Sequence, residues 1–541
     1  MDRLSRTHLL RLALAAAGAF LVEPRAALAQ LRAPTLERLT VRNAGRRYAG
    51  DRRLFATVSP GIAGRDRATI AFKLERAATV QLDAVRATQR SRKSVWRTRK
   101  RFAAGKHRLS WRPDEHTEVG SYLMQLTVED RHGTRTYGKY RPQKASLARA
   151  PVVRVLGVAA AFDQRSYAPN RPARLTITAD ARRLTLQLIA CGAEAEYSER
   201  ADELSGRPVG SPRTLDWTGK RSSPHTVAVS LGPWPSGLYA ARLTTDDGRV
   251  GYAPFVLRPA VLGTARQAVV MPTNTWQAYN FDDADGDGWG DTWYAGGSPP
   301  VRLDRPFLQR GTPAWFSRRE APFLKYLRQG SRMPDFLAED DLEALPSGDE
   351  LRRLYDLVVY PGHTEYVTER EYDVIQRFRD LGGRLIMLSA NNFFWKVEKN
   401  GQSMRRIKLW RDLGRPESAL FGVQYRANDD GSRQGVIRVM NTDAVPWLFE
   451  GTGLVDGSVL GDVVGGYGIE IDQTTAFTPP NTIVLGEIPN LYGPGLTAQM
   501  TYYESENGAR VFSAGVLDFG GSAPLWPVRR LLDNLWRHFT Q

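Results

Sequence analysis

Side chains that could carry out chemistry follow three apolar segments in the C-terminal half of the chain. His363 and Glu365 come directly after the apolar segment 357–360, Asn391 follows a second such segment, and Tyr279 follows a third. Carboxylate, phenol and imidazole groups can bind a metal ion or transfer protons. The sequence therefore predicts an active site around these residues, and Gly362-His363-Thr364-Glu365 is its most distinctive segment.

The segments around these residues predict the strands and helices that position them. Residues 357–360 and 384–388 are short apolar runs typical of buried strands, and 369–381 between them has helical spacing and ends at Gly382-Gly383. This order predicts a right-handed crossover in a parallel sheet. Because sites form beyond the carboxyl ends of parallel strands, we expect the polar groups to meet at one edge. The predicted fold class is α/β, mostly parallel, with a glutamine-amidotransferase or flavodoxin-like layout.

The N-terminal half of the chain has the pattern of an all-β protein. Short runs in which apolar and polar residues alternate, such as 68–74, are separated by turn residues. We predict two immunoglobulin-like β-sandwich domains, at 51–150 and 151–260, ahead of the α/β domain at 261–541. Residues 30–50 are polar and irregular and are predicted to form a linker.

The first 29 residues have the three parts of a signal peptide. Arginines come first, the apolar run 12–22 follows, and Ala27-Leu28-Ala29 precedes Gln30. The run is too short to form a stable membrane anchor. We expect export to the periplasm or the extracellular space, by the Sec route or by a degenerate twin-arginine signal in which Thr7 replaces the second arginine.

The composition excludes several kinds of site and leaves a basic surplus. Cys191 is the single cysteine, which excludes an intramolecular disulfide and a cysteine-based metal site, and no Gly-x-Ser-x-Gly nucleophile elbow occurs. The formal charge is +17, and residues 86–112 contain 11 Lys and Arg. This surplus could be a solvated strand face or could contact an anionic envelope polymer, whereas no nucleic-acid motif accompanies it. The sequence is compatible with a homo-oligomer and does not decide the oligomeric state.

The loop after Tyr279 has the spacing of a calcium-binding loop. Carboxylates occupy its first, third, fifth and ninth positions, and a glycine occupies the sixth. The carboxylates are Asp283, Asp285, Asp287 and Asp291. The twelfth position is Tyr294 instead of Glu, so the loop is either a Ca²⁺ site that braces the segment carrying Tyr279 or an acidic turn.

Several of these segments resemble the C-terminal catalytic domain of the large (beta) subunit of N,N-dimethylformamidase. The segments are Thr275 to Asn280, Arg305-Pro306-Phe307, Glu320 to Leu327, Gly362 to Tyr366 and Gly382 to Asn391. The resemblance covers residues from about 235 to 535. It implies a mononuclear ferric iron, Fe(III), held by two tyrosines and one glutamate. The phenolate and carboxylate oxygens of such a set are hard donors suited to Fe(III).

The resemblance also assigns roles to individual residues. The implied metal ligands are Tyr239, Tyr279 and Glu365, with His363 as their neighbour. Asn391 would orient the substrate or an oxyanion, and Glu504 would act as the general acid or base.

Together these features predict an exported, metal-dependent hydrolase of a small amide or formamide-like C–N bond. The signal peptide and the calcium-like loop are departures from the family. The alternative function is a non-catalytic envelope protein that binds an anionic or carbohydrate polymer through its β-sandwich modules.

Overall fold

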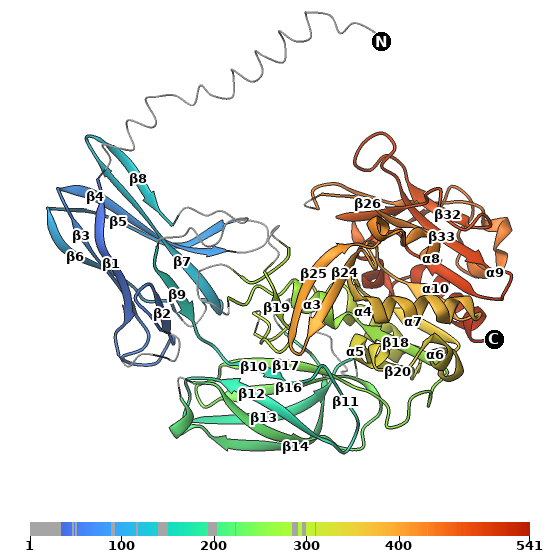
Figure 1. Cartoon of the computed structure of the whole chain (residues 1–541), viewed down its shortest axis with the longest axis horizontal. Coiled ribbons are helices and arrows are strands. Elements are labelled where there is room, and N and C mark those ends of the chain that lie inside the picture. The colour runs from blue at the N-terminus through green and yellow to red at the C-terminus, as the bar shows by residue number, and fades with distance from the viewer. Residues whose placement is uncertain are drawn as a thin grey trace, which may run out of the picture. The chain divides into compact units, whose positions relative to one another are not determined.

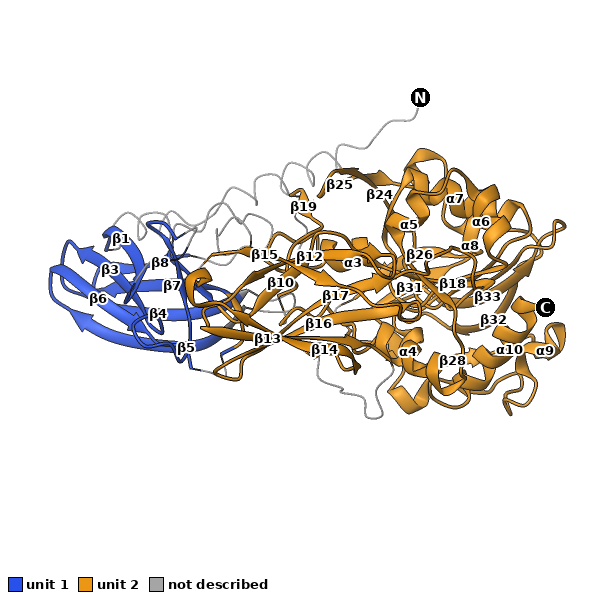
Figure 2. Cartoon of the chain, turned by 90° about the horizontal axis from the view of Figure 1, so that it is seen from below, with its two compact units in different colours: residues 1–117, 121–155, 286–289 blue, residues 118–120, 156–285, 290–541 orange. Residues whose placement is uncertain are grey.

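The computed structural model describes residues 34–541, except 46–47, 49–50, 88–91, 115–116, 139–149, 193–202, 222, 284–289, 295–298, 309 and 430. The chain divides into two units (Figures 1 and 2). Unit 1 comprises residues 1–117, 121–155 and 286–289, and unit 2 comprises residues 118–120, 156–285 and 290–541. The predicted signal peptide lies outside the described residues. In the part of the chain that the structure describes, no helix is long and apolar enough to cross a membrane.

Unit 1, within its described residues, is built from β-strands in two sheets. One sheet has the order β1-β3-β6, and the other has the order β2-β9-β7-β4-β5, with β8 paired to β7. The strands are β1 (Leu36–Asn43), β2 (Phe55–Val58), β3 (Ala68–Leu74), β4 (Ala78–Ala87), β5 (Arg92–Phe102), β6 (Gly105–Trp111), β7 (Gly120–Asp130), β8 (Gly133–Tyr137) and β9 (Val152–Val155). Every second side chain of β3 is buried, so one face of the strand lies against the core. The all-β prediction for this region is confirmed.

Strand β1 lies in the range 30–50 that was predicted to be a linker. It pairs antiparallel with β3, with Val41 opposite Ile70. Val41 is buried, and Leu36 and Leu39 pack against the same core. The linker prediction was therefore wrong for Leu36–Asn43. An irregularity in the register between Glu37 and Thr40 interrupts the period-2 alternation, which made the strand hard to recognise from the sequence.

The first part of unit 2 is a second group of β-strands in two sheets, with the orders β10-β12-β15 and β11-β17-β16-β13-β14. The strands are β10 (Ala159–Phe162), β11 (Ser166–Tyr167), β12 (Pro172–Thr178), β13 (Arg183–Ala190), β14 (Arg207–Asp216), β15 (His225–Ser230), β16 (Gly237–Thr245) and β17 (Val250–Leu257). Trp217 and Phe255 are among the side chains buried in the core between these sheets. We refer to this part as the second sandwich.

The remainder of unit 2 is organised around a nine-stranded sheet with the order β20-β18-β21-β23-β34-β33-β32-β28-β29. Its strands are β18 (Gln267–Met271), β20 (Asp335–Ala338), β21 (Leu357–Tyr360), β23 (Arg384–Met387), β28 (Ile437–Val439), β29 (Val459–Leu460), β32 (Ile483–Ile488), β33 (Ala498–Glu504) and β34 (Arg510–Ser513). Neighbouring strands are parallel from β20 to β34. They are antiparallel from β34 to β29.

The predicted α/β class with a mostly parallel, glutamine-amidotransferase or flavodoxin-like sheet was wrong. The protein is mostly β, with 41% strand and 17% helix, and its sheets are mixed or antiparallel. The unit of strand 357–360, helix and strand 384–388 is present, with β21 and β23 parallel. Beyond it the chain returns through hairpins such as β32–β33–β34, which give antiparallel pairs. Apolar periodicity marks a buried strand but not its direction, so the sequence could not separate the two halves of the sheet.

Helices and shorter strands complete unit 2. The helices are α3 (Thr273–Ala278), α4 (Glu320–Gln329), α5 (Glu339–Glu343), α6 (Gly348–Leu354), α7 (Glu369–Asp380), α8 (Ser418–Phe421), α9 (Pro446–Phe449) and α10 (Val528–Thr540). The other strands are β19 (Val301–Arg302), β22 (Tyr366–Thr368), β24 (Trp395–Asn400), β25 (Ser403–Leu409), β26 (Gln424–Asn428), β27 (Gln434–Gly435), β30 (Tyr467–Gly468) and β31 (Glu470–Gln473). In α7 the Thr368 hydroxyl accepts from the Glu371 N–H as an N-cap, and Ile375 and Phe378 are buried.

Candidate functional site

Three neighbouring strands of the nine-stranded sheet position the candidate site. β18, β21 and β23 are adjacent in the order β18-β21-β23. Helix α3 follows β18 and ends at Tyr279, the loop with His363 and Glu365 follows β21, and Asn391 follows β23. The three polar groups predicted from the sequence therefore lie beyond the same ends of adjacent strands.

Two tyrosines and a glutamate form the centre of this site. The Tyr279 hydroxyl donates a hydrogen bond to Glu365 Oε2. The Tyr366 side chain is hydrogen-bonded within the same group. All three side chains are buried, and the rings of the two tyrosines meet edge to face, with centroids 5.6 Å apart. The backbone N–H groups of residues 365 and 366 both donate to Thr275 Oγ1, at 3.0 and 3.4 Å, which ties this loop to α3.

His363 lies between Glu365 and a second carboxyl group, that of Glu470, whose side chain is 12% exposed. His363 Nε2 is 3.6 Å from Glu365 Oε2 and 3.2 Å from Glu470 Oε2. The Asn391 side chain is hydrogen-bonded to Glu470, and the Asn391 backbone carbonyl accepts from His363. Asn391 has φ of 55° and donates its backbone N–H to Asp472 Oδ1 at 2.8 Å, which fixes this left-handed conformation. We call Tyr279, His363, Glu365, Tyr366, Asn391 and Glu470 the site cluster.

Burial dominates the electrostatics of the site cluster. It raises the pKa of Glu365 to about 8, with the negative charge of Glu470 adding to the effect. It raises the pKa of Glu470 to about 7, against the opposing charge of Arg319. Burial and Arg319 hold the pKa of His363 well below its ordinary value, so this imidazole is neutral near pH 7. Arg319 Nε itself lies 3.0 Å from Asp518 Oδ1.

The donor set of the site cluster fits a hard metal ion. His363 Nε2, Glu470 Oε2 and Asn391 Oδ1 are buried and have no hydrogen-bond partner among the described residues. Buried polar atoms are usually partnered, so atoms of this kind indicate a place for a ligand. Phenol and carboxylate oxygens are donors that suit Fe(III). Within the described residues, no group of three or more His, Cys, Asp and Glu side chains has metal-site geometry, so the tyrosines would be needed for a ligand set.

Tyr239, an expected metal ligand, is not brought to the site cluster. It lies in β16 with its ring in the core of the second sandwich, between the rings of Trp234 and Phe255. Its hydroxyl donates to the Pro235 carbonyl at 2.8 Å, and burial raises its pKa to about 12. Tyr366 instead supplies the second phenol next to Tyr279 and Glu365.

Glu504, the expected acid or base, is also away from the site cluster. It lies at the end of β33 with 49% of its side chain exposed, and its Oε1 is 3.4 Å from both Arg510 Nε and His538 Nε2. Although partial burial raises the pKa of Glu504, hydrogen bonds from Tyr502 and His538 and the Arg510 charge lower it overall. The resemblance placed the general acid or base at Glu504 near the late strand, whereas the structure brings Glu470 of β31 to His363.

Glu470, Asp472, Arg319 and Tyr366 are site residues that the sequence analysis did not single out. Glu470 and Asp472 alternate with apolar residues in Gly468-Ile469-Glu470-Ile471-Asp472, and both lie beside the site, Asp472 buried and Glu470 nearly so. Acidic residues alternating with isoleucine in a short strand are unusual on a buried face, and this pattern was an available signal. In the calcium-like loop, Asp285 and Asp287 lie outside the described residues. Ca²⁺ binding there stays a prediction.

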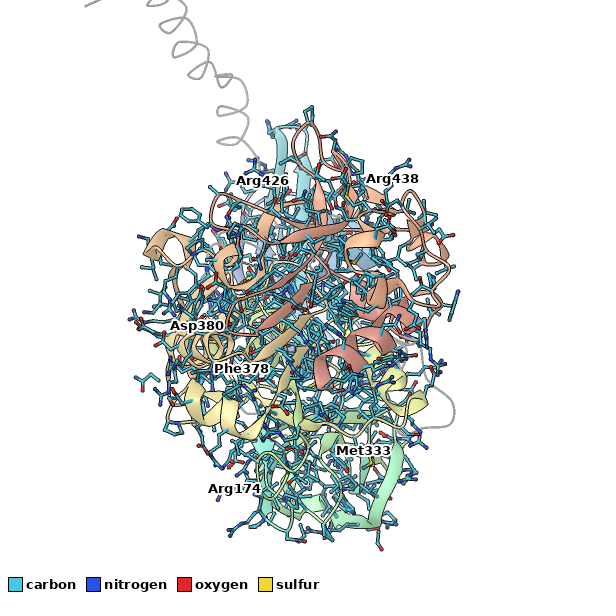
Figure 3. The ribbon with its side chains drawn as sticks, turned by 90° about the vertical axis from the view of Figure 1, so that its right-hand side faces the viewer. Arg174, Met333, Phe378, Asp380, Arg426 and Arg438 are labelled. Atoms are coloured by element: carbon cyan, nitrogen blue, oxygen red, sulfur yellow. The ribbon has the colours of Figure 1, made fainter. Side chains whose placement is uncertain are left out.

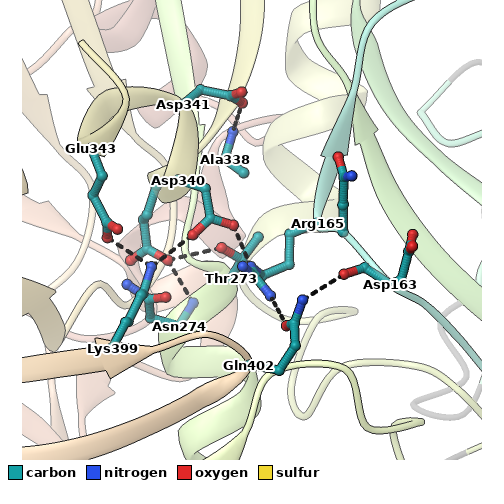
Figure 4. A network of polar contacts seen from close by, with 12 residues as sticks. Asp163, Arg165, Thr273, Asn274, Ala338, Asp340, Asp341, Glu343, Lys399 and Gln402 are labelled. Atoms are coloured by element: carbon teal, nitrogen blue, oxygen red, sulfur yellow. Dashed lines mark hydrogen bonds and ion pairs between the residues drawn. The ribbon is translucent and has the colours of Figure 1, made fainter. Parts of the chain in front are cut away.

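The N-terminal end of α3 is held by a buried glutamate. Glu339 Oε2 accepts from Thr273 Oγ1 at 2.9 Å and from the Asn274 backbone N–H at 2.5 Å. Figure 4 shows Thr273 and Asn274 within a larger network of polar contacts. Because α3 is only six residues long and ends at Tyr279, this anchor also fixes the position of the Tyr279 phenol.

The network around Glu339 has more carboxyl groups than cations. Lys399 Nζ lies 2.8 Å from Asp340 Oδ1 and 2.7 Å from Glu343 Oε1 (Figure 4), and Arg165 also pairs with Asp340. Burial raises the pKa of Glu339 to about 8, against the charge of Lys399. Burial and the nearby Glu339 charge raise the pKa of Glu371 far above its ordinary range. Burial and the neighbouring Glu343 charge therefore favour the protonated form of Glu339 in the folded protein.

We expect the protein to be more stable at pH 5.5 than at pH 8.5. The folded-state pKa of Glu339, about 8, exceeds its ordinary value of 4.5, so its contribution to stability is complete below pH 4.5 and is lost as the pH rises towards 8. Each unit of such a shift corresponds to ~1.4 kcal/mol. Glu339→Gln keeps an oxygen for Thr273 and removes the titration, so thermal unfolding of this variant should depend less on pH. An unchanged pH dependence in Glu339→Gln would show that Glu339 does not hold a proton.

The comparisons with known proteins match the part of the chain that contains the site cluster. The family model described as "N,N-dimethylformamidase beta subunit-like, C-terminal" matches residues 213–527, more than half of the chain. The N,N-dimethylformamidase beta subunits of Alcaligenes sp and Paracoccus aminophilus are 24% and 23% identical over 301 residues. These alignments cover 45% of this chain and 39% of each relative, so the chain matches about two fifths of the length of these relatives. The resemblance inferred from the sequence motifs is confirmed.

Likeness to solved structures is weak. The mmIFT52 N-terminal domain has a TM-score of 0.28 and 12% identity, covering 42% of this chain and 92% of that chain. The native conformation of E. coli alpha-2-macroglobulin has a TM-score of 0.22 and 12% identity, covering 41% and 16%. No assignment of fold or function follows from these scores.

Proposed function

The chain belongs to the N,N-dimethylformamidase beta subunit-like, C-terminal family, and we propose that it hydrolyses an amide C–N bond at the site cluster. The observation that carries this proposal is that two phenols, two carboxyl groups and a neutral imidazole lie in one place, all buried except Glu470, which is 12% exposed, with three buried polar atoms left unpartnered. A polar set of this kind needs a ligand to satisfy it, and a substrate or a metal ion supplies one. The substrate class we propose is a small amide or formamide-like compound.

In this proposal Tyr279, Tyr366 and Glu365 hold an Fe(III) ion. Tyr366 takes the place that the resemblance gave to Tyr239, because its hydroxyl belongs to the same hydrogen-bonded group as Tyr279 and Glu365. When bound, the metal would polarise the amide carbonyl or lower the pKa of a water molecule. The phenol and carboxylate oxygens need no thiol, which agrees with a chain that has a single cysteine outside the site.

Glu470 and His363 would move the protons. Glu470 Oε2 and His363 Nε2 are 3.2 Å apart and neither makes a hydrogen bond, so a water molecule bound beside them could give a proton to either. The neutral state of His363 lets it accept a proton. Asn391 holds both groups, through its backbone carbonyl to His363 and its side chain to Glu470. The unpartnered Asn391 Oδ1 can accept a hydrogen bond from the substrate N–H or from water.

The place of action that we propose is outside the cytoplasm, in the periplasm or extracellular space. The basic, apolar and small-residue segments of the first 29 residues support it.

Iron binding by matched tyrosine variants tests the proposed ligand set. Wild-type protein loaded with iron should show a visible phenolate-to-iron absorption band and about one iron per chain. Tyr279→Phe should lose most of the band and of the iron, because it removes one of three ligands. Tyr239→Phe should keep both, since the Tyr239 hydroxyl is bonded to Pro235 within the second sandwich. Loss of the band in Tyr239→Phe with retention in Tyr279→Phe would overturn this ligand set.

A further inference from the structure

The net positive charge of the chain comes from unit 1. Residues 36–155 contain 28 Lys and Arg and 10 Asp and Glu, a net charge of 28 − 10 = +18. Residues 156–541 contain 42 Lys and Arg and 46 Asp and Glu, a net charge of 42 − 46 = −4. Charge asymmetry of this size between two parts of a chain indicates that the basic part contacts an anionic partner.

Within unit 1, a group of basic side chains lies on the outer face of the β1-β3-β6 sheet. The antiparallel register places Lys73 opposite Lys106, Ala71 opposite Arg108, and Arg42 opposite Thr69. Adjacent residues of β3 and β6 alternate between the core and solvent, so these side chains share the solvent face. We call Arg42, Lys73, Lys106 and Arg108 the basic face; its strands lie side by side in Figures 1 and 2.

The basic face has little compensating negative charge. Lys73 Nζ lies 2.9 Å from Glu37 Oε2, a pair that is about 40% exposed on each side. No acidic side chain among the described residues pairs with Arg42, Lys106 or Arg108. Lys106 is directly opposite Lys73, and like charges in this position destabilise a sheet. A bound anion would relieve this repulsion.

The outer face of the other sheet of unit 1 is different, because two of its arginines have acidic partners. Arg97 Nε lies 2.6 Å from Asp83 Oδ1, and Arg99 Nη2 lies 2.8 Å from Glu129 Oε2. Arg76, in the turn between β3 and β4, pairs with Asp130 at the end of β7. Two of the basic side chains of β5, Arg97 and Arg99, are therefore neutralised by acidic partners, and we regard the basic face as the stronger candidate for binding.

We propose that the basic face binds a linear anionic polysaccharide. Outward-facing residues two apart in a strand are ~7 Å apart and neighbouring strands are ~4.8 Å apart, so the cations form a grid that can follow an extended charged chain. Thr69 and Ser110 lie on the same face with their hydroxyls 3.3 Å apart, and hydroxyl groups are suitable partners for sugar hydroxyls.

The chemistry of the face argues against nucleic acid and lipid. Phe72 and Trp111, the aromatic residues of β3 and β6, are buried on the core side, so they cannot stack on nucleobases. Val95 of β5 is the one large hydrophobic residue of unit 1 that is exposed in the described part of the chain, and it is not on this face. A membrane-binding face would present several apolar side chains to insert into the bilayer.

Binding of the full chain to polygalacturonate tests this proposal, with neutral dextran, single-stranded oligothymidylate and anionic phosphatidylglycerol vesicles as comparison probes. The wild-type protein should bind polygalacturonate in low salt and should bind it more tightly than the other probes. Lys106→Glu/Arg108→Glu should raise the Kd at least tenfold and reduce the salt dependence of binding, because two ionic contacts are lost.

The matched control is Arg426→Glu/Arg438→Glu, which makes the same change in net charge at two exposed arginines of unit 2, both labelled in Figure 3. This variant should keep the wild-type Kd within twofold. Equal affinity of the two double variants would overturn the proposal, as would tighter binding of oligothymidylate or vesicles than of polygalacturonate. A thermal melt of each variant separates loss of binding from loss of folding.

Discussion

Glu365→Gln is expected to lower the rate of amide hydrolysis at least a thousandfold and to reduce the bound iron to a small fraction. The substitution preserves the shape of the side chain but removes its charge, at a position where the Tyr279 hydroxyl donates to Glu365 Oε2. A thousandfold loss corresponds to ~4 kcal/mol of transition-state stabilisation, which is the order expected when a metal ion is lost. Metal analysis and amine release measured on the same preparation check both parts.

Glu504→Gln is the matched control for this variant. Glu504 is half exposed and pairs with Arg510 and His538, outside the site cluster. We expect its rate and iron content to stay within twofold of wild type. If Glu365→Gln keeps its iron and its rate while Glu504→Gln loses them, the location of the site is contradicted.

Glu470→Gln is expected to lower kcat by about 10²- to 10⁴-fold while iron stays bound, which is the range for loss of a general acid or base. Glu470 Oε2 faces His363 Nε2 at 3.2 Å, and the neutral amide keeps the shape of the carboxylate but is too weak a base to accept a proton. Unchanged iron content would distinguish a role of Glu470 in proton transfer from a role as a metal ligand. Because Asn391 donates to Glu470, the variant keeps a hydrogen-bond acceptor there and should fold normally.

Steady-state kinetics with a small formamide, together with metal analysis, provide the check. A fall in kcat with little change in KM supports a role in proton transfer. A variant with wild-type kcat would rule it out, and a variant that has lost its iron would instead make Glu470 a metal ligand.

Much of the candidate site could be predicted because its residues follow buried strands that are neighbours in the sheet. Tyr279, Glu365 and Asn391 come after β18, β21 and β23, and short apolar runs followed by polar residues are visible in the sequence. Their approach follows from the adjacency of these strands. By contrast, Glu470 comes from a short strand about eighty residues further on, and nothing local in the sequence specifies where that strand lies.

The position of Tyr239 could not be predicted for a similar reason. Residues that alternate along β16 face opposite sides, and Leu238 and Tyr239 belong to different cores. A spacing-based match cannot tell which of the two sides a tyrosine faces, whereas a hydroxyl already bonded to Pro235 settles it. The strand directions in the nine-stranded sheet could not be predicted from the sequence either, because parallel and antiparallel strands have similar patterns of buried residues.

The central claim is that the site cluster hydrolyses an amide C–N bond, and the most direct measurement is the release of amine from a panel of small formamides by the iron-loaded wild-type chain. The account predicts turnover of at least one formamide, abolished in Glu365→Gln and preserved in Glu504→Gln. An iron-loaded, folded protein that releases no amine from any member of the panel, or that does so equally well with Gln at position 365, would contradict it.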